Sequence, residues 1–150
     1  MIFKKTGLFV LTLAMTLSLA YGLSAQPQDL DNITAEQLNK EGPLTQKDVE
    51  LYIKFFELSA TTVKNESQKP KGQDLDDTFS NTASNFAKEN NISIVRLRYI
   101  MEKIPMAIMG SATDTPIPAD MPYLALSPEE SALVKENTPK IVAVIQKFSE

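Results

Sequence analysis

The sequence predicts an all-α fold, a small four-helix bundle with Pro-kinked third and fourth helices that is preceded by a signal-peptide helix. Apolar residues recur at helical spacing in four segments of the chain. Capping residues or clusters of acids open these segments, and loops rich in proline, glycine and polar residues separate them. The chain has 150 residues, 43% of them hydrophobic and 23% charged, which suits a single globular domain.

Residues 1–25 have the three parts of a secretory signal peptide. Two lysines form a basic start, an apolar run covers residues 7–20, and small residues offer cleavage after Gly22 or Ala25. The run is shorter than the roughly 20 residues of a membrane-spanning helix, so an uncleaved anchor is the less favoured alternative. We therefore expect a secreted or periplasmic protein that meets the membrane only transiently, through this segment.

A polar leader, residues 26–44, is predicted to precede the helical bundle domain of residues 45–150. Within the leader, Thr34 and Gln37 have the spacing of a capping box, in which each side chain bonds the other residue's backbone N–H. This pair predicts a short helix that begins at Thr34.

The first long helix is predicted to begin at Thr45, with Asp48 in the capping-box position. Its apolar residues form two stripes, Val49, Tyr52, Phe56, Ala60 and Val63 on one and Leu51, Phe55 and Leu58 on the other. So wide an apolar arc exceeds what a surface helix needs. The helix is therefore predicted either to pack centrally in the bundle or to keep one face for another chain.

The second and third helices follow a polar loop. Residues 75–90 carry a narrow stripe of Leu75, Phe79, Ala83 and Phe86. The third helix begins at Ser93 and has a bundle seam at alternating spacings of three and four, made of Ile94, Leu97, Met101, Ile104 and Ile108. Pro105 is expected to end or kink this helix, because proline lacks an N–H and clashes with the preceding turn.

A connection with three prolines, residues 111–126, leads to the last helix. It is longer than most bundle loops, which makes it a candidate functional segment. The last helix has Ser127 at its N-cap and Pro128 at its first position. Pro139 is expected to interrupt it, with Thr138 as a new N-cap.

The composition excludes several kinds of chemistry. The chain has no histidine, cysteine or tryptophan, so a Ser-His-Asp triad, a cysteine nucleophile, a His/Cys zinc site and a Cys-ligated iron–sulfur cluster are all impossible within it. We expect no enzyme activity, no catalytic residue, no metal and no cofactor. A net charge of −4 and two arginines, Arg96 and Arg98, argue against a nucleic-acid partner. One of these arginines is expected to pair with an acid of a neighbouring helix.

The candidate binding site is a Met-containing groove formed by the end of the third helix and the connection after it. Its predicted members are Met101, Ile104, Met106, Ile108, Met109, Ile117, Met121 and Tyr123. Flexible, polarizable methionines suit surfaces that accommodate varied partners, so the groove would take a small apolar ligand or a protein partner. The alternative is that these residues are ordinary core.

Two further functions stay open. The chain could be a structural or assembly subunit whose two-faced first helix packs against another chain. It could also carry Cu(I), because the thioethers of Met106 and Met109 have M-x-x-M spacing and are soft ligands.

Overall fold

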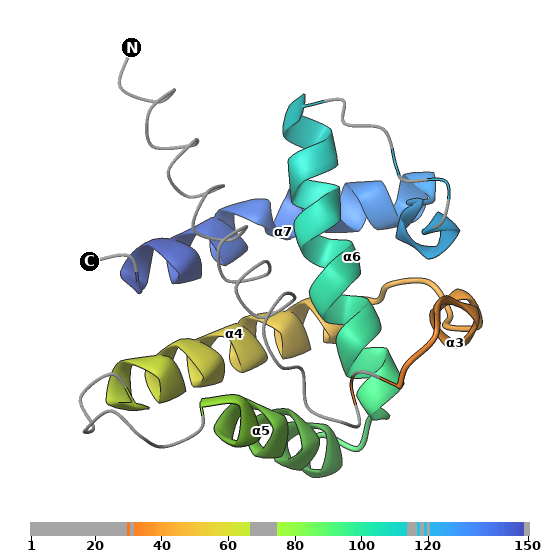
Figure 1. The fold of residues 1–150 in the computed structure, drawn as a ribbon. Helices are drawn as coiled ribbons and strands as arrows, with labels where there is room; N and C mark the ends of the chain where they lie inside the picture. The colour runs from red at the N-terminus through yellow and green to blue at the C-terminus, as the bar shows by residue number, and fades with distance from the viewer. Residues whose placement is uncertain are drawn as a thin grey trace.

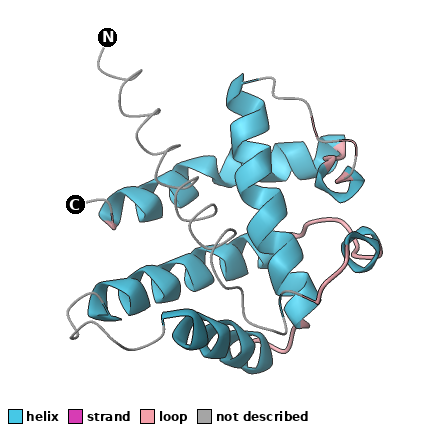
Figure 2. Ribbon diagram, viewed as in Figure 1, coloured by secondary structure: helices cyan, strands magenta, loops and turns pink. Residues whose placement is uncertain are grey.

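The structure is a computed structural model that describes residues 30, 32–66, 75–113, 117, 119 and 121–148. It contains α3 (Ala35–Asn39), α4 (Gln46–Glu66), α5 (Leu75–Glu89), α6 (Ile94–Thr113), the short 3-10 helix η1 (Pro122–Leu124) and α7 (Pro128–Lys147). The described residues form helices, turns and loops with no strand, which confirms the all-α prediction (Figure 2). The predicted signal peptide, residues 1–25, lies outside the described residues. In the part of the chain that is described, no helix has the length and apolar content to cross a bilayer.

Two helices begin at the caps that the sequence predicts. The Thr34 backbone N–H donates to Gln37 Oε1 at 2.8 Å, and Thr34 Oγ1 accepts from the Gln37 backbone N–H at 3.3 Å. The Thr45 backbone N–H donates to Asp48 Oδ2 at 2.7 Å. These side chains satisfy backbone groups that a helix terminus otherwise leaves unpaired, so local sequence fixes where α3 and α4 begin.

The last helix has a fuller cap than the sequence interpretation gave it. Ser127 Oγ accepts from the Glu130 backbone N–H at 3.1 Å, as predicted for the N-cap. In addition, the Ser127 backbone N–H donates to Glu130 Oε2 at 2.9 Å, which completes a capping box. Glu130 is therefore held in place by its own helix before it meets any other element.

The expectation that two prolines end or interrupt their helices is wrong. α6 runs without a break through Pro105, and α7 runs through Pro139. Thr138 does not cap a new helix, because its Oγ1 donates to the Val134 carbonyl one turn earlier, at 2.7 Å. A proline within a helix removes one backbone hydrogen bond, and burial of Ile104 and Ile141 beside the two prolines holds these helices in the core. That the helices bend there stays a prediction.

α4 contacts α5, α6 and α7, and α6 in turn contacts α3, α4, α5, α7 and η1. In Figure 1, α6 crosses α4 and α7 at a steep angle instead of running beside them, so the regular four-helix bundle is not confirmed. The prediction that the first helix packs on more than one side is confirmed. Phe55, from the second apolar stripe, is 2% exposed and its ring contacts those of Phe79 and Phe86. At the far end of α4, Leu58 and Val63 are 40% and 39% exposed.

The polar leader contributes to the same core. Ile33, Leu38 and Leu44 are all buried. α3 packs against α6 and η1, and Arg98 of α6 donates to the Leu30 and Ile33 carbonyls. These contacts bring the leader to one side of α6 and place it beside the start of α7.

Candidate functional site

The five predicted site residues on α6 have unequal exposure. Ile104 is fully buried in the core. Met101, Met106 and Ile108 are partly buried and pack against the core, and Met109 is half buried. In the view of Figure 1, the C-terminal end of α6 projects beyond its crossing with α7. The last turns of α6 therefore present methionine and isoleucine side chains that the described core covers only in part.

The three predicted residues that follow α6 also separate. Ile117 is 43% exposed and Met121 is 38% exposed. Tyr123 is buried, and its hydroxyl donates to Glu102 Oε2 at 2.6 Å. This bond joins η1 to α6, so Tyr123 fixes the end of the connection while Ile117 and Met121 stay accessible.

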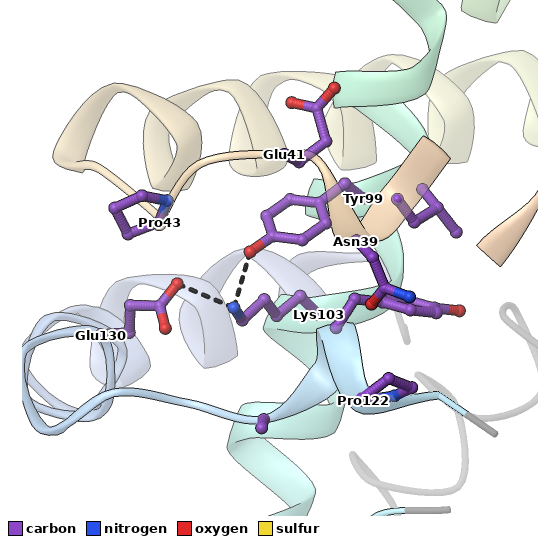
Figure 3. A pocket seen from close by; sticks show the side chains of 10 residues that line it. Asn39, Glu41, Pro43, Tyr99, Lys103, Pro122 and Glu130 are labelled. Atoms are coloured by element: carbon purple, nitrogen blue, oxygen red, sulfur yellow. Dashed lines mark hydrogen bonds and ion pairs between the residues drawn. The ribbon is translucent and has the colours of Figure 1, made fainter. Parts of the chain in front are cut away.

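A cavity of about 300 Å³ opens where α3, α6, η1 and the start of α7 meet (Figure 3). Its apolar and aromatic walls come from Leu38, Pro43, Tyr99, Pro122, Tyr123 and Ala125. Its polar walls come from Asn39, Glu41, Lys103 and Glu130. Of the eight residues predicted for the groove, Tyr123 lines this cavity, and no methionine is among the residues that line it.

A buried ion pair forms one side of the cavity. Lys103 Nζ lies 2.8 Å from Glu130 Oε1, and both side chains are 5% exposed. Lys103 also donates to the Tyr99 hydroxyl at 2.6 Å, as the dashed lines in Figure 3 show. Glu130 Oε1 accepts in addition from the Leu44 backbone N–H at 2.8 Å. Burial of two charges is costly unless they are paired and further hydrogen bonded, and here both conditions hold.

The pKa of Glu130 reflects these opposing effects. Burial acts to raise the pKa of Glu130, but hydrogen bonds from Lys103, Ser127 and Leu44 and the charge of Lys103 outweigh it. The net result is a lowered pKa. Glu130 therefore stays ionised at neutral pH, where it joins α7 to α6 and to the chain just before α4.

Arg96 organises the neighbouring part of the leader. Its Nη2 and Nε contact the two carboxylate oxygens of Asp48 at 2.6 and 3.1 Å, and its Nη1 lies 3.3 Å from Glu41 Oε2. The same guanidinium donates to the Gly42 and Pro43 carbonyls. The expected pairing of an arginine with an acid of a neighbouring helix is thus confirmed by Arg96 and Asp48.

The Arg96 contact also sets the charge state of its partner. Burial acts to raise the pKa of Asp48, but hydrogen bonds from Arg96 and Thr45 and the charge of Arg96 lower it overall. The pKa of Arg96 is raised in turn, because Asp48 and Glu41 stabilise its charged form against the cost of burial. Arg96 Cζ lies 5.0 Å from the centroid of the Tyr99 ring, so the same residue supports one wall of the cavity.

The sequence interpretation missed Tyr99, Lys103 and Glu130 as a group. The spacing in the sequence gives a weak indication that Lys103 is buried, because Lys103 lies three residues after Ile100 and four before Ala107, which are on the buried side of α6. A charged residue in an apolar stripe requires a partner. The partner lies on a different helix, so spacing along the chain does not identify it.

The chain matches no family model, no curated protein and no solved structure in comparisons with each. Among the described residues, no group of three or more aspartates or glutamates is placed to share a metal ion.

Proposed function

We propose that this is a small, non-enzymatic helical protein, secreted or periplasmic after removal of residues 1–25, that binds a protein partner through a Met-containing surface. This surface, here called the α6 end surface, consists of Met106, Ile108, Met109, Ile117 and Met121. The observation that carries the proposal is the exposure of Ile117 and Met121. They are two of the four most exposed large hydrophobic side chains in the described part of the chain.

A protein partner fits the α6 end surface better than a small apolar ligand does. Small ligands bind in concave, largely apolar sites that bury most of their surface. The cavity between α3, α6, η1 and α7 is lined in part by charged groups and by no methionine, whereas Met106 and Met109 are partly buried near the end of α6. Flexible, polarizable methionine side chains adapt their packing to a partner helix or loop.

Site-specific photo-crosslinking in the producing cell tests this proposal. A photoreactive residue at Met121 is expected to crosslink to a specific partner in the secreted or periplasmic fraction. The matched control carries the same residue at Leu58 on α4, where exposure is 40% against 38% at Met121. A crosslink at 121 that disappears in Met109→Asp and is absent at 58 supports the α6 end surface.

The two alternatives predict other results. Crosslinking of one copy of the chain to another through Leu58 would replace the proposal with an assembly role for the exposed end of α4. A native mass spectrum with added copper, lost in the double variant Met106→Ala and Met109→Ala, would favour a Cu(I) carrier.

A further inference from the structure

Two polar side chains of the cavity, Lys103 and Tyr99, have N–H or O–H donors that no described residue uses. The Lys103 ammonium has three N–H donors, and its contacts with Glu130 and the Tyr99 hydroxyl use two of them. The Tyr99 hydroxyl accepts from Lys103, so its own hydrogen is still available. Neither group makes a further hydrogen bond to the described residues. Two donors thus sit side by side at the cavity wall, on side chains that are both at least nine-tenths buried.

The acceptor that contacts Lys103 is already engaged by a second donor. Glu130 Oε1 accepts from the Leu44 backbone N–H and from Lys103, and Oε2 accepts from the Ser127 backbone N–H. Buried polar groups are in general hydrogen bonded. A position within reach of both Lys103 Nζ and Tyr99 Oη therefore suits an oxygen acceptor.

Charge selects further among acceptors. Lys103 and Glu130 neutralise each other, and Glu41 on the opposite wall is an acid whose partner is Arg96. An anionic ligand would place another negative charge beside Glu41 and Glu130 in a chain whose net charge is already −4. A neutral carbonyl oxygen accepts both hydrogen bonds without that repulsion.

The apolar and aromatic walls of the cavity indicate that the rest of the ligand is apolar. Tyr99 and Tyr123 supply aromatic surface, Pro43 and Pro122 supply rigid apolar surface, and these are features that water alone does not require. The exposed side-chain amide of Asn39 lies on the rim and can accept from an N–H. We propose that this cavity binds a small neutral amide, with its carbonyl oxygen accepting from both Lys103 Nζ and Tyr99 Oη and its apolar body against the tyrosines and prolines. This site is separate from the α6 end surface and does not depend on the proposed function.

Three probes of similar shape and different charge test this proposal on the wild-type protein. Benzamide is neutral with a carbonyl acceptor, benzoate is an anionic acceptor, and benzylamine is a cation with donors alone. The measurement is a titration followed by the amide resonances of Leu44 and Ser127, whose N–H groups both donate to Glu130. Benzamide is expected to shift both resonances and to bind about tenfold more tightly than either charged probe, as one well-placed hydrogen bond corresponds to roughly that factor.

A hydroxyl deletion locates the probe. Tyr99→Phe keeps the ring and removes one donor, so it is expected to weaken benzamide binding roughly 2- to 12-fold. Tyr52→Phe is the matched control, a buried tyrosine on α4 outside the cavity lining, and it is expected to leave the affinity unchanged. The proposal is overturned if no probe shifts the two resonances or if benzoate or benzylamine binds as tightly as benzamide. It is also overturned if folded Tyr99→Phe retains full affinity, or if a crystal grown with benzamide holds only ordered water in the cavity.

Discussion

The two halves of α6 are built differently. Up to Ile104, the helix carries Arg96, Arg98 and Lys103, each of which pairs with a carboxylate. From Pro105 to the end of the helix, the sequence contains no charged residue, and methionine and isoleucine supply its large side chains. The first half is therefore held by ion pairs as well as by buried apolar residues such as Ile100, whereas the second half packs through apolar side chains alone.

The difference separates a structural half from an adaptable one. Buried charges accept few arrangements, because each must keep its partner and its hydrogen bonds. The first half of α6 thereby fixes the positions of the leader, α4 and α7 relative to one another. Partly exposed methionines tolerate many arrangements. The second half is accordingly the better place to meet a partner, and the predictions below test this division from the largest expected effect to the smallest.

The largest effect is expected from Lys103→Met. This substitution leaves the Glu130 carboxylate buried without its cation, and breaking such a pair costs about 3–5 kcal/mol. The free energy of unfolding from urea denaturation measures the loss. The double variant Lys103→Met and Glu130→Gln removes both charges and should recover much of it. A loss below about 1 kcal/mol in the single variant would show that the pair is hydrated in solution and contributes little.

A smaller loss is expected from Arg96→Ala. The substitution removes the two-point contact with Asp48 and the bonds to the Gly42 and Pro43 carbonyls, at roughly 2–3 kcal/mol. The control is Lys40→Ala, which breaks an ion pair with Glu36 whose side chains are 71% and 79% exposed. That pair should contribute less than about 0.5 kcal/mol. Equal losses in the two variants would contradict a structural role for Arg96.

The ion pairs of Arg96 with Asp48 and of Lys103 with Glu130 make part of the stability dependent on pH. Because the folded-state pKa values of Asp48 and Glu130 are lowered, their stabilisation is present above the unfolded-state values of about 3.9 and 4.3. It is lost as the pH falls through the lower folded-state values. In Arg96→Ala, burial without the cation favours protonated Asp48, so the loss of stability relative to wild type should shrink between pH 7 and pH 3. Urea denaturation at both pH values measures this change, and a loss that is constant or greater at pH 3 would contradict the assigned role of Asp48.

The sequence predicts local features of this molecule better than distant ones. Thr34, Thr45 and Ser127 each cap a helix as predicted, because a capping residue and its partners lie within three or four positions. The helical class follows for the same reason, since apolar spacing is a local signal. The prediction that Pro105 ends its helix is wrong, because tertiary packing decides whether a helix continues through a proline, and such packing is not a local property of the sequence.

The site combines both kinds of information. The sequence predicts that Met106 and Met109 lie near the end of α6 but leaves open whether they are groove or core, and in the structure they are partly buried. The cavity does not follow from spacing along the chain, because Lys103 and Glu130 are 27 residues apart and Leu44 is 86 residues from Glu130. The composition of residues 26–44 predicts a polar leader, yet Leu38 is buried in the core and lines the cavity. An average over the segment does not reveal the burial of a single residue.

The smallest effect on stability is expected at the end of α6. Met109→Ala removes a half-exposed side chain and should cost less than about 1 kcal/mol, while it weakens the crosslink from position 121 to a partner. Ile100→Ala is the matched substitution in the first half of the helix, where the side chain is fully buried and truncation costs about 2–5 kcal/mol. Thermal unfolding and crosslink yield, measured on both variants, separate packing from binding. If Met109→Ala costs as much stability as Ile100→Ala, the second half of α6 is core, and a methionine that serves packing has no need of a partner.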